Sequence, residues 1–165
     1  MTILDRPRAA FALLFAVCVG LVAFALYLQH ARQLEPCPMC VLQRYVFIMI
    51  ALVVLVAAIH GSRGLALKLY GGAVIALGVI GSGVAMRHLW VQRFPPPNAG
   101  CAVELEFLME SLPFTSWLPA IFRGSADCSK VDWTFIGVSI PGWALVWFVI
   151  FIVFIFLILR RTRRP

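Results

Sequence analysis

Four of the five cysteines lie at two places in the sequence, Cys37 and Cys40 at the first and Cys101 and Cys128 at the second. CxxC is the spacing of redox dithiols, in which one thiolate attacks a disulfide and its neighbour resolves the mixed disulfide. Four cysteines allow three pairings, and stable structural disulfides would use the same residues. Zinc normally requires two CxxC knuckles with further Cys or His ligands, so we expect no metal site.

Two charged or titratable side chains accompany the CxxC pair. Cys40 lies at the predicted N-terminus of an apolar helix, where the helix dipole favours a thiolate. Arg44 follows at i+4, on the same helix face and one turn deeper, where its guanidinium can stabilise a thiolate or an anionic cofactor. The alternative is an arginine that merely extends to the membrane surface. His88, at the outer end of another apolar run, shares this predicted depth.

The elements that carry these residues are apolar enough to be membrane helices. Hydrophobic residues make up 62% of the 165 residues and charged residues only 13%, which excludes an ordinary soluble domain and a disordered chain. A spanning helix needs about 20 mostly apolar residues. Four stretches qualify, and we expect one integral membrane domain over 1–165 with spans at about 9–28, 41–59, 65–86 and 142–159.

The net charge of +7 comes from residues at the edges of these spans, which favours the positive-inside rule over nucleic-acid binding. By that rule we expect both termini and the turn at 60–64 to lie in the cytoplasm. The positive charges that predict this are Arg6, Arg8, Arg63 and the arginines of 160–164. The loops at about 29–40 and 87–141 are then periplasmic. A cleavable signal peptide is the alternative for the first span, and it would leave the remaining topology unchanged.

The long outer loop and the fifth cysteine complete the prediction. Prolines 95–97 prevent the third helix from continuing, 104–112 has the pattern of a short amphipathic helix, and 112–118 is apolar enough to lie on the membrane interface. Cys18 lies in the middle of the first span, where we expect a small packing residue without a redox role.

Catalytic thiol oxidation would require an electron acceptor within reach of the membrane surface. The chain contains no haem CxxCH, no dinucleotide fingerprint and no second metal-type cysteine cluster. A lipid-soluble quinone is therefore the simplest acceptor. His88 could bond a quinone oxygen, and an interfacial histidine bonded to backbone or lipid is the alternative.

These features together resemble the DsbB family of disulfide-bond formation proteins over nearly the whole chain. The resemblance is carried by residues 35–45 (EPCPMCVLQRY), by His88 ahead of Cys101, and by Cys128 followed by WTFIG at 133–137 and a Pro-Gly-Trp. It implies an all-α membrane protein, a four-helix transmembrane bundle whose large periplasmic loop carries a short interfacial helix. The implied location is the bacterial inner membrane.

The resemblance also implies an activity, the oxidation of a DsbA-like periplasmic thioredoxin-fold oxidase at the expense of ubiquinone or menaquinone. By matching positions, the partner's thiolate attacks Cys101 and releases Cys128, which exchanges with Cys37 and frees Cys40. The Cys40 thiolate would meet the quinone beside Arg44 and His88, with Trp133 near that end of the route.

Two departures from the family pattern concern the CxxC region. Gln43 occupies a position where an acidic residue can occur, which questions a proton-handling role there, and the Pro-Met between the cysteines leaves the dithiol's oxidising strength open. Two alternatives to the enzyme are a membrane scaffold braced by inert disulfides and a relative of vitamin K epoxide reductase. The latter would place the CxxC late in the chain.

Overall fold

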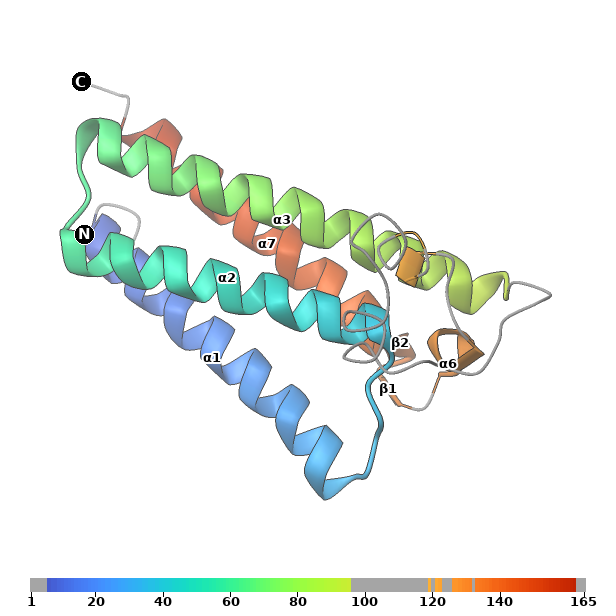
Figure 1. Ribbon diagram of the computed structural model, residues 1–165. Helices are drawn as coiled ribbons and strands as arrows, with labels where there is room; N and C mark the ends of the chain where they lie inside the picture. The colour runs from blue at the N-terminus through green and yellow to red at the C-terminus, as the bar shows by residue number, and fades with distance from the viewer. Residues whose placement is uncertain (1–5, 96–118, 120, 123–125, 132, 163–165) are drawn as a thin grey trace.

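The computed structural model describes residues 6–95, 119, 121–122, 126–131 and 133–162. Four long helices dominate it, and each is long and apolar enough to cross a membrane. This confirms the predicted four-helix membrane fold. The helices are α1 (Pro7–Ala31), α2 (Pro38–His60), α3 (Gly64–Arg93) and α7 (Ile140–Arg161), and they run up and down in sequence order (Figure 1).

The bundle has two chemically different ends. The first turn of α1, the turn between α2 and α3, and the last turn of α7 lie together at one end (Figure 1), which we call the terminal end. The opposite end, which we call the loop end, holds the start of α2 and the start of α7. The CxxC sequence therefore lies at the loop end.

Local sequence explains where the helices begin and end. Prolines stand in the first turn of α1, α2 and α7, where a missing N–H costs nothing. Gly61 ends α2 in the left-handed conformation, with φ of 64°. The third helix continues through Arg93, beyond the expected limit at Met86, and ends at Phe94 just before the prolines. His88 therefore lies within α3 and not in a loop.

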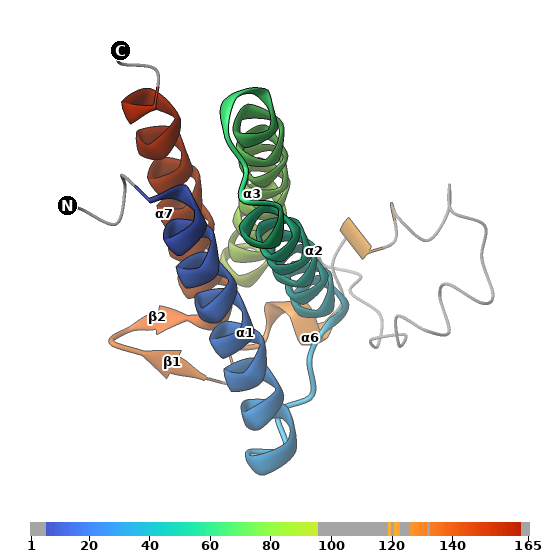
Figure 2. The ribbon, with the colours of Figure 1, turned by 90° about the vertical axis from the view of Figure 1, so that its left-hand side faces the viewer.

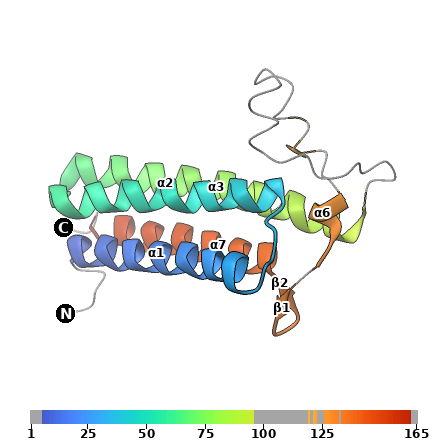
Figure 3. The same cartoon turned by 60° about the horizontal axis from the view of Figure 1, so that its bottom comes forward.

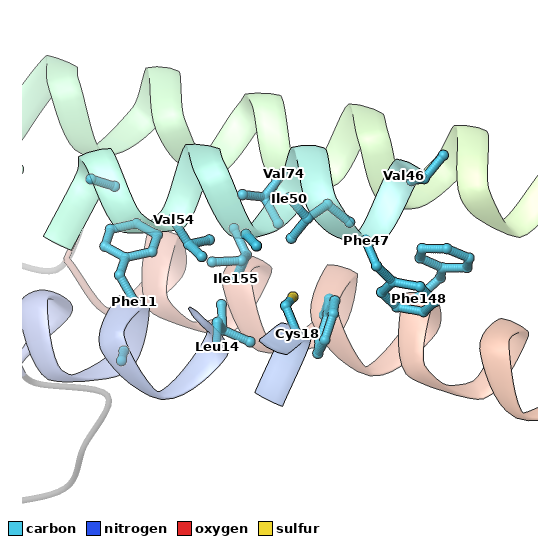
Figure 4. Close-up of a cluster of buried hydrophobic side chains, with 14 of the residues drawn as sticks. Phe11, Leu14, Cys18, Val46, Phe47, Ile50, Val54, Val74, Phe148 and Ile155 are labelled. Carbon is cyan, nitrogen blue, oxygen red and sulfur yellow. The ribbon is translucent and has the colours of Figure 1, made fainter. Parts of the chain in front are cut away.

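The four helices pack as a chain of neighbours, α1 on α2, α2 on α3 and α3 on α7. Figure 2 shows the bundle from one side, with the ribbon of β1 and β2 at its loop end. Their shared core is apolar along most of the bundle (Figure 4). The rings of Phe47 and Phe148 stack with centroids 4.2 Å apart. Cys18 is fully buried in this core, which agrees with its expected role as a small packing residue.

Glycines of α3 allow α7 to approach closely, as small residues do between membrane helices. A Cβ atom added to Gly81 would lie 2.5 Å from Cζ of Phe148, and one on Gly78 would lie 2.8 Å from Cγ1 of Ile152. Gly83 lies on another face, where no described atom would come within 4 Å of an added Cβ.

We expect Gly81→Ala to destabilise the bundle by about 2 kcal/mol, because the Phe148 ring is held against Phe47 and overpacking a core costs about 1–3 kcal/mol. Gly83→Ala is the matched control, since it should keep the roughly 1 kcal/mol gain in helix propensity without a collision. Thermal unfolding of the detergent-solubilised proteins measures both changes. Equal midpoints for the two variants would contradict the close packing of α3 on α7.

Smaller elements cover the loop end (Figure 3). They are α6 (Ala126–Ser129) and an antiparallel ribbon of β1 (Thr134–Phe135) and β2 (Val138–Ser139). The ribbon was not predicted. Ile136 and Gly137 both have positive φ, of 54° and 75°, which is the geometry of a tight type I′ hairpin turn. The expected helix at 104–112 and the interfacial segment at 112–118 lie outside the described residues.

Candidate functional site

The CxxC pair lies at the first turn of α2. Cys37 is the N-cap residue of this helix and is only 6% exposed. Its Sγ lies 3.4 Å from Sγ of Cys40, so a small movement would bring the two sulfurs to the ~2.05 Å of a disulfide. Because the helix N-terminus carries a partial positive charge, a thiolate is favoured at this end of α2.

Cys128 reaches the same place from α6. Its side chain is 1% exposed, forms a hydrogen bond with Cys37, and packs in a small apolar cluster with Met39, Val91 and Ile121. Two cysteines that are far apart in sequence are therefore in contact. Cys101 lies outside the described residues.

His88 lies between the two cysteines. It is 1% exposed, and its Nε2 is 3.6 Å from Cys37 Sγ. Its Nδ1 is 3.2 Å from Nε2 of Gln43, and the imidazole also forms a hydrogen bond with the backbone of Cys128. The ring thus touches α2, α3 and α6 together.

Two sulfurs and one imidazole make a donor set that soft metals such as zinc accept. The ligating atoms of Cys37, His88 and Cys128 lie within 4.8 Å of one another. The same sulfurs are the ones that thiol exchange would use, and our expectation of no metal site stays a prediction.

Burial and neighbouring thiols change the acidity of Cys37. The hydrogen bond with Cys128 lowers its pKa, but the hydrogen bond with Cys40 and the loss of hydration outweigh that effect, and the pKa is raised to about 12. Since the thiolate is the nucleophile in disulfide exchange, reduced Cys37 is a poor attacking group at neutral pH. This geometry suits Cys37 as the sulfur that is attacked.

Alkylation of the fully reduced protein tests this pKa. Relative to an ordinary thiol, a rise of about three pKa units lowers the thiolate fraction 1000-fold, and higher nucleophilicity offsets part of this, so we expect Cys37 to react roughly 50-fold more slowly at pH 8. Its rate should keep rising past pH 9, where the unfolded control levels off. Mass spectrometry of the Cys37 peptide measures this, and a plateau near pH 9 in the folded protein would contradict the raised pKa.

Arg44 lies one helical turn after Cys40, as expected. One nitrogen of its guanidinium group has a hydrogen-bond partner, and another has none among the described residues. Its Nη1 donates a 2.8 Å hydrogen bond to Oε1 of Gln29 in α1. Its Nε is buried and has no hydrogen-bond partner among the described residues. An unpaired donor of this kind is costly in an apolar environment.

A cavity of about 540 Å³ adjoins these groups. Cys37, Cys40, Arg44, His88 and Trp133 all line it, so the structure brings together five of the seven predicted site residues around one space. Cys128 joins them through its contact with Cys37. The remaining lining is mostly apolar and aromatic and includes Phe24, Phe47, Phe135, Trp143 and Trp147. The role of each site residue stays a prediction.

Trp133 is held at the edge of this cavity by other aromatic rings. Its ring meets that of Phe24 edge to face at 5.9 Å and lies nearly parallel to that of Phe135 at 6.1 Å. The indole of Trp143 donates a 3.1 Å hydrogen bond to the Phe135 carbonyl. The β-ribbon and the start of α7 therefore form one wall of the cavity.

Sequence reasoning missed the polar partners of the site. Gln29 and Gln43 bind Arg44 and His88, and Gln92 accepts a 2.9 Å hydrogen bond from Ser139, which ties α3 to the ribbon. Each is a glutamine near the loop end of an otherwise apolar helix. That placement was the available signal, because an uncharged polar residue in such a helix requires a partner.

Four helices able to span a membrane, with a cysteine and histidine cluster beside a ligand-sized cavity, define a multi-pass membrane protein with thiols at one end of its bundle. The sequence model of a protein family, described as "Disulfide bond formation protein DsbB", matches residues 7–158. The chain therefore belongs to the DsbB family.

Relatives named "Disulfide bond formation protein B" support this assignment. The protein of Aromatoleum aromaticum is 49% identical over 156 residues, 94% of each chain. The protein of Azoarcus sp. is 48% identical over 139 residues, 84% of each chain, and that of Acidovorax sp. is 43% identical over 158 residues, 96% of this chain and 90% of the relative. Family membership identifies the chain as a disulfide-forming membrane oxidoreductase.

Proposed function

We propose that the chain oxidises a periplasmic thioredoxin-like dithiol oxidase of the DsbA type and passes the electrons to a membrane quinone, which sustains disulfide formation in periplasmic proteins. The observation that carries this proposal is the contact of Cys128 with Cys37 at the edge of the cavity beside Arg44. A contact between sulfurs from two distant parts of the chain, at the edge of a mostly apolar cavity, supports exchange between them beside a lipid-soluble acceptor.

The thiol steps follow from the order of the cysteines and their contacts. The partner's thiolate attacks Cys101 of a Cys101–Cys128 disulfide, and Cys128 leaves as a thiolate. Cys128 then attacks Cys37 of the Cys37–Cys40 disulfide, and Cys40 leaves with the electron pair. Cys37 is buried between the two other sulfurs, which suits the central sulfur of this exchange.

The residues around the cavity fit a quinone, either ubiquinone or menaquinone. A quinone has a flat apolar ring with two oxygens that accept hydrogen bonds. When bound, it would accept two electrons. The guanidinium of Arg44, which lines the cavity, would donate to an oxygen, and the aromatic lining with Trp133 would contact the ring. His88 lines the same cavity, so the predicted contact between His88 and a quinone stays part of the proposal.

We further propose that the protein lies in the bacterial inner membrane with both termini in the cytoplasm and the loop end in the periplasm. The distribution of charge supports this orientation. Arg8, Arg63 and Arg160 lie at the terminal end, and Arg8 donates hydrogen bonds of 3.2 and 3.1 Å to the last carbonyls of α2. An oxidising periplasm is also the compartment in which disulfides persist.

Quinone reduction by the purified protein tests this function. Reduced DsbA-type partner and a water-soluble ubiquinone analogue are added to the detergent-solubilised protein, and the quinone absorbance is followed with and without the partner. We expect catalytic bleaching that requires both substrates. Cys18→Ala should behave like the natural chain, because Cys18 is buried in the bundle core. Stable disulfides with no bleaching would instead favour a structurally braced scaffold.

A further inference from the structure

The imidazole of His88 contacts both cysteines that the proposed function requires to exchange. We propose that Gln43 and His88 form a positioning pair that holds Cys128 against Cys37 for the exchange between the two loops. This inference rests on the proposed function. It assigns a role to Gln43, a position at which the chain departs from the family pattern. The role toward Cys128 is additional to any contact His88 makes with a quinone.

The contacts of His88 connect the elements that must meet. His88 comes from α3, Cys37 from the start of α2, and Cys128 from α6. The Nε2 atom lies 3.6 Å from Cys37 Sγ, and the ring bonds the Cys128 backbone. A four-residue helix such as α6 has little stability of its own, so contacts with the bundle must determine where Cys128 lies.

Gln43 determines how the imidazole is presented. Gln43 is 3% exposed and His88 is 1% exposed, and polar groups buried to this degree require partners. The Gln43 amide nitrogen donates to Nδ1 across 3.2 Å, so the ring proton is on Nε2. Nε2 is then the donor that faces Cys37 and the Cys128 backbone, and an amide cannot take up the proton as a carboxylate could.

The exchange itself needs only alignment. The Cys128 thiolate attacks Cys37 Sγ, the Cys37–Cys128 bond forms as the Cys37–Cys40 bond breaks, and the electron pair leaves on Cys40. The number of disulfides is unchanged and no net proton transfer is required. Bringing three sulfurs into line is therefore the protein's main contribution to this step, and His88 touches one sulfur and the backbone that carries the second.

The test isolates the loop-to-loop disulfide. The full-length chain carries Cys40→Ser and Cys101→Ser, so Cys37 and Cys128 are the only outer cysteines left. The equilibrium between their disulfide and a glutathione redox buffer then measures the effective concentration of the two thiols. We expect His88→Ala to lower it about tenfold, the equivalent of one hydrogen bond. His88→Gln should restore most of the loss, because its amide can donate from the position of Nε2.

Gln43→Leu provides a second variant with an intact imidazole, and we expect it to lower the effective concentration about threefold to tenfold by releasing the ring. The matched control carries Cys101→Ser and Cys128→Ser and so keeps only the Cys37–Cys40 pair. His88→Ala should change that pair at least fivefold less. Val74→Ala, in the bundle core and outside the cluster that holds Cys37 and Cys128, controls for lowered stability alone.

An equal fall of both cysteine pairs, or no fall in the Cys37–Cys128 pair, would overturn the positioning role. Failure of His88→Gln to restore the pair would also count against it, because loss of packing alone would then explain the effect. The assay contains neither quinone nor a protein partner. A failed quinone assay with the natural chain would therefore contradict the proposed function without changing this result.

Discussion

Replacing Cys40 by serine is expected to abolish quinone reduction by a dithiol partner, with a loss of at least about 10³-fold. A serine hydroxyl forms no disulfide and is a far weaker acid than a thiol, so the chain would lose both the oxidant of Cys128 and the sulfur that faces the cavity. Cys40 lines that cavity together with Arg44. Cys37 lines the same cavity, and its Sγ lies 3.4 Å from Sγ of Cys40.

In the Cys40→Ser protein, an added mild oxidant should also cross-link Cys37 to Cys128. The Cys128 thiolate loses its disulfide target, but Cys37 and Cys128 remain in contact, so mild oxidation should trap them as a disulfide visible by mass spectrometry under non-reducing conditions. Cys18→Ser is the control and should retain full activity. Unaltered turnover of the Cys40→Ser protein would refute the proposed electron route.

Arg44→Leu is expected to lower kcat/KM for the quinone about 100-fold, because a hydrogen bond from a charged group is worth about 1.5–3 kcal/mol. Arg44 lines the cavity, and its guanidinium carries five N–H donors, of which Gln29 binds one at Nη1. Most of the effect should fall on the apparent KM, and the disulfide exchange between Cys128 and Cys37 should be unaffected. Initial rates over a range of quinone concentrations measure it.

Arg44→Lys and Gln29→Ala separate charge from geometry at this position. Lysine keeps the charge but loses the planar array of donors, so we expect it to recover only part of the affinity. Gln29→Ala removes the acceptor that holds Nη1 at 2.8 Å, and the resulting loss should be smaller, about threefold to tenfold. An unchanged KM in Arg44→Leu would show that the guanidinium only reaches toward the membrane surface.

The parts of the fold that were predicted correctly depend on local properties of the chain. The length of each apolar run is enough to indicate a membrane helix, because an unsatisfied backbone is so costly in lipid that only a helix or a closed barrel can span it. The β-ribbon and the extension of α3 to Arg93 were missed. Both depend on short segments, one a tight turn at Ile136 with an unusual positive φ, whose residues carry no strong pattern.

The residues of the candidate site likewise divide into those that local sequence placed correctly and those whose positions depend on packing between helices. Cys37, Cys40 and Arg44 lie within the first two turns of α2 and its N-cap, so their spacing was enough to place them together. The family resemblance depended on several such local motifs along the chain. The glutamines were not predicted as partners. Gln43 and His88 are separated along the chain by most of two helices, and a hydrogen bond of that kind depends on how α2 and α3 rotate against each other.

Hydrophobic length and CxxC spacing act within single segments, so the membrane class, the four spanning helices and the expected thiol chemistry could all be predicted from local sequence. The folded structure adds that Cys128 lies against Cys37, that His88 is held by Gln43, and that Arg44 lines a cavity beside them. The physical reason is that these contacts join different helices. The distances between these residues depend on side-chain packing between helices, such as that of Phe148 against Gly81. No single segment of the sequence encodes that packing.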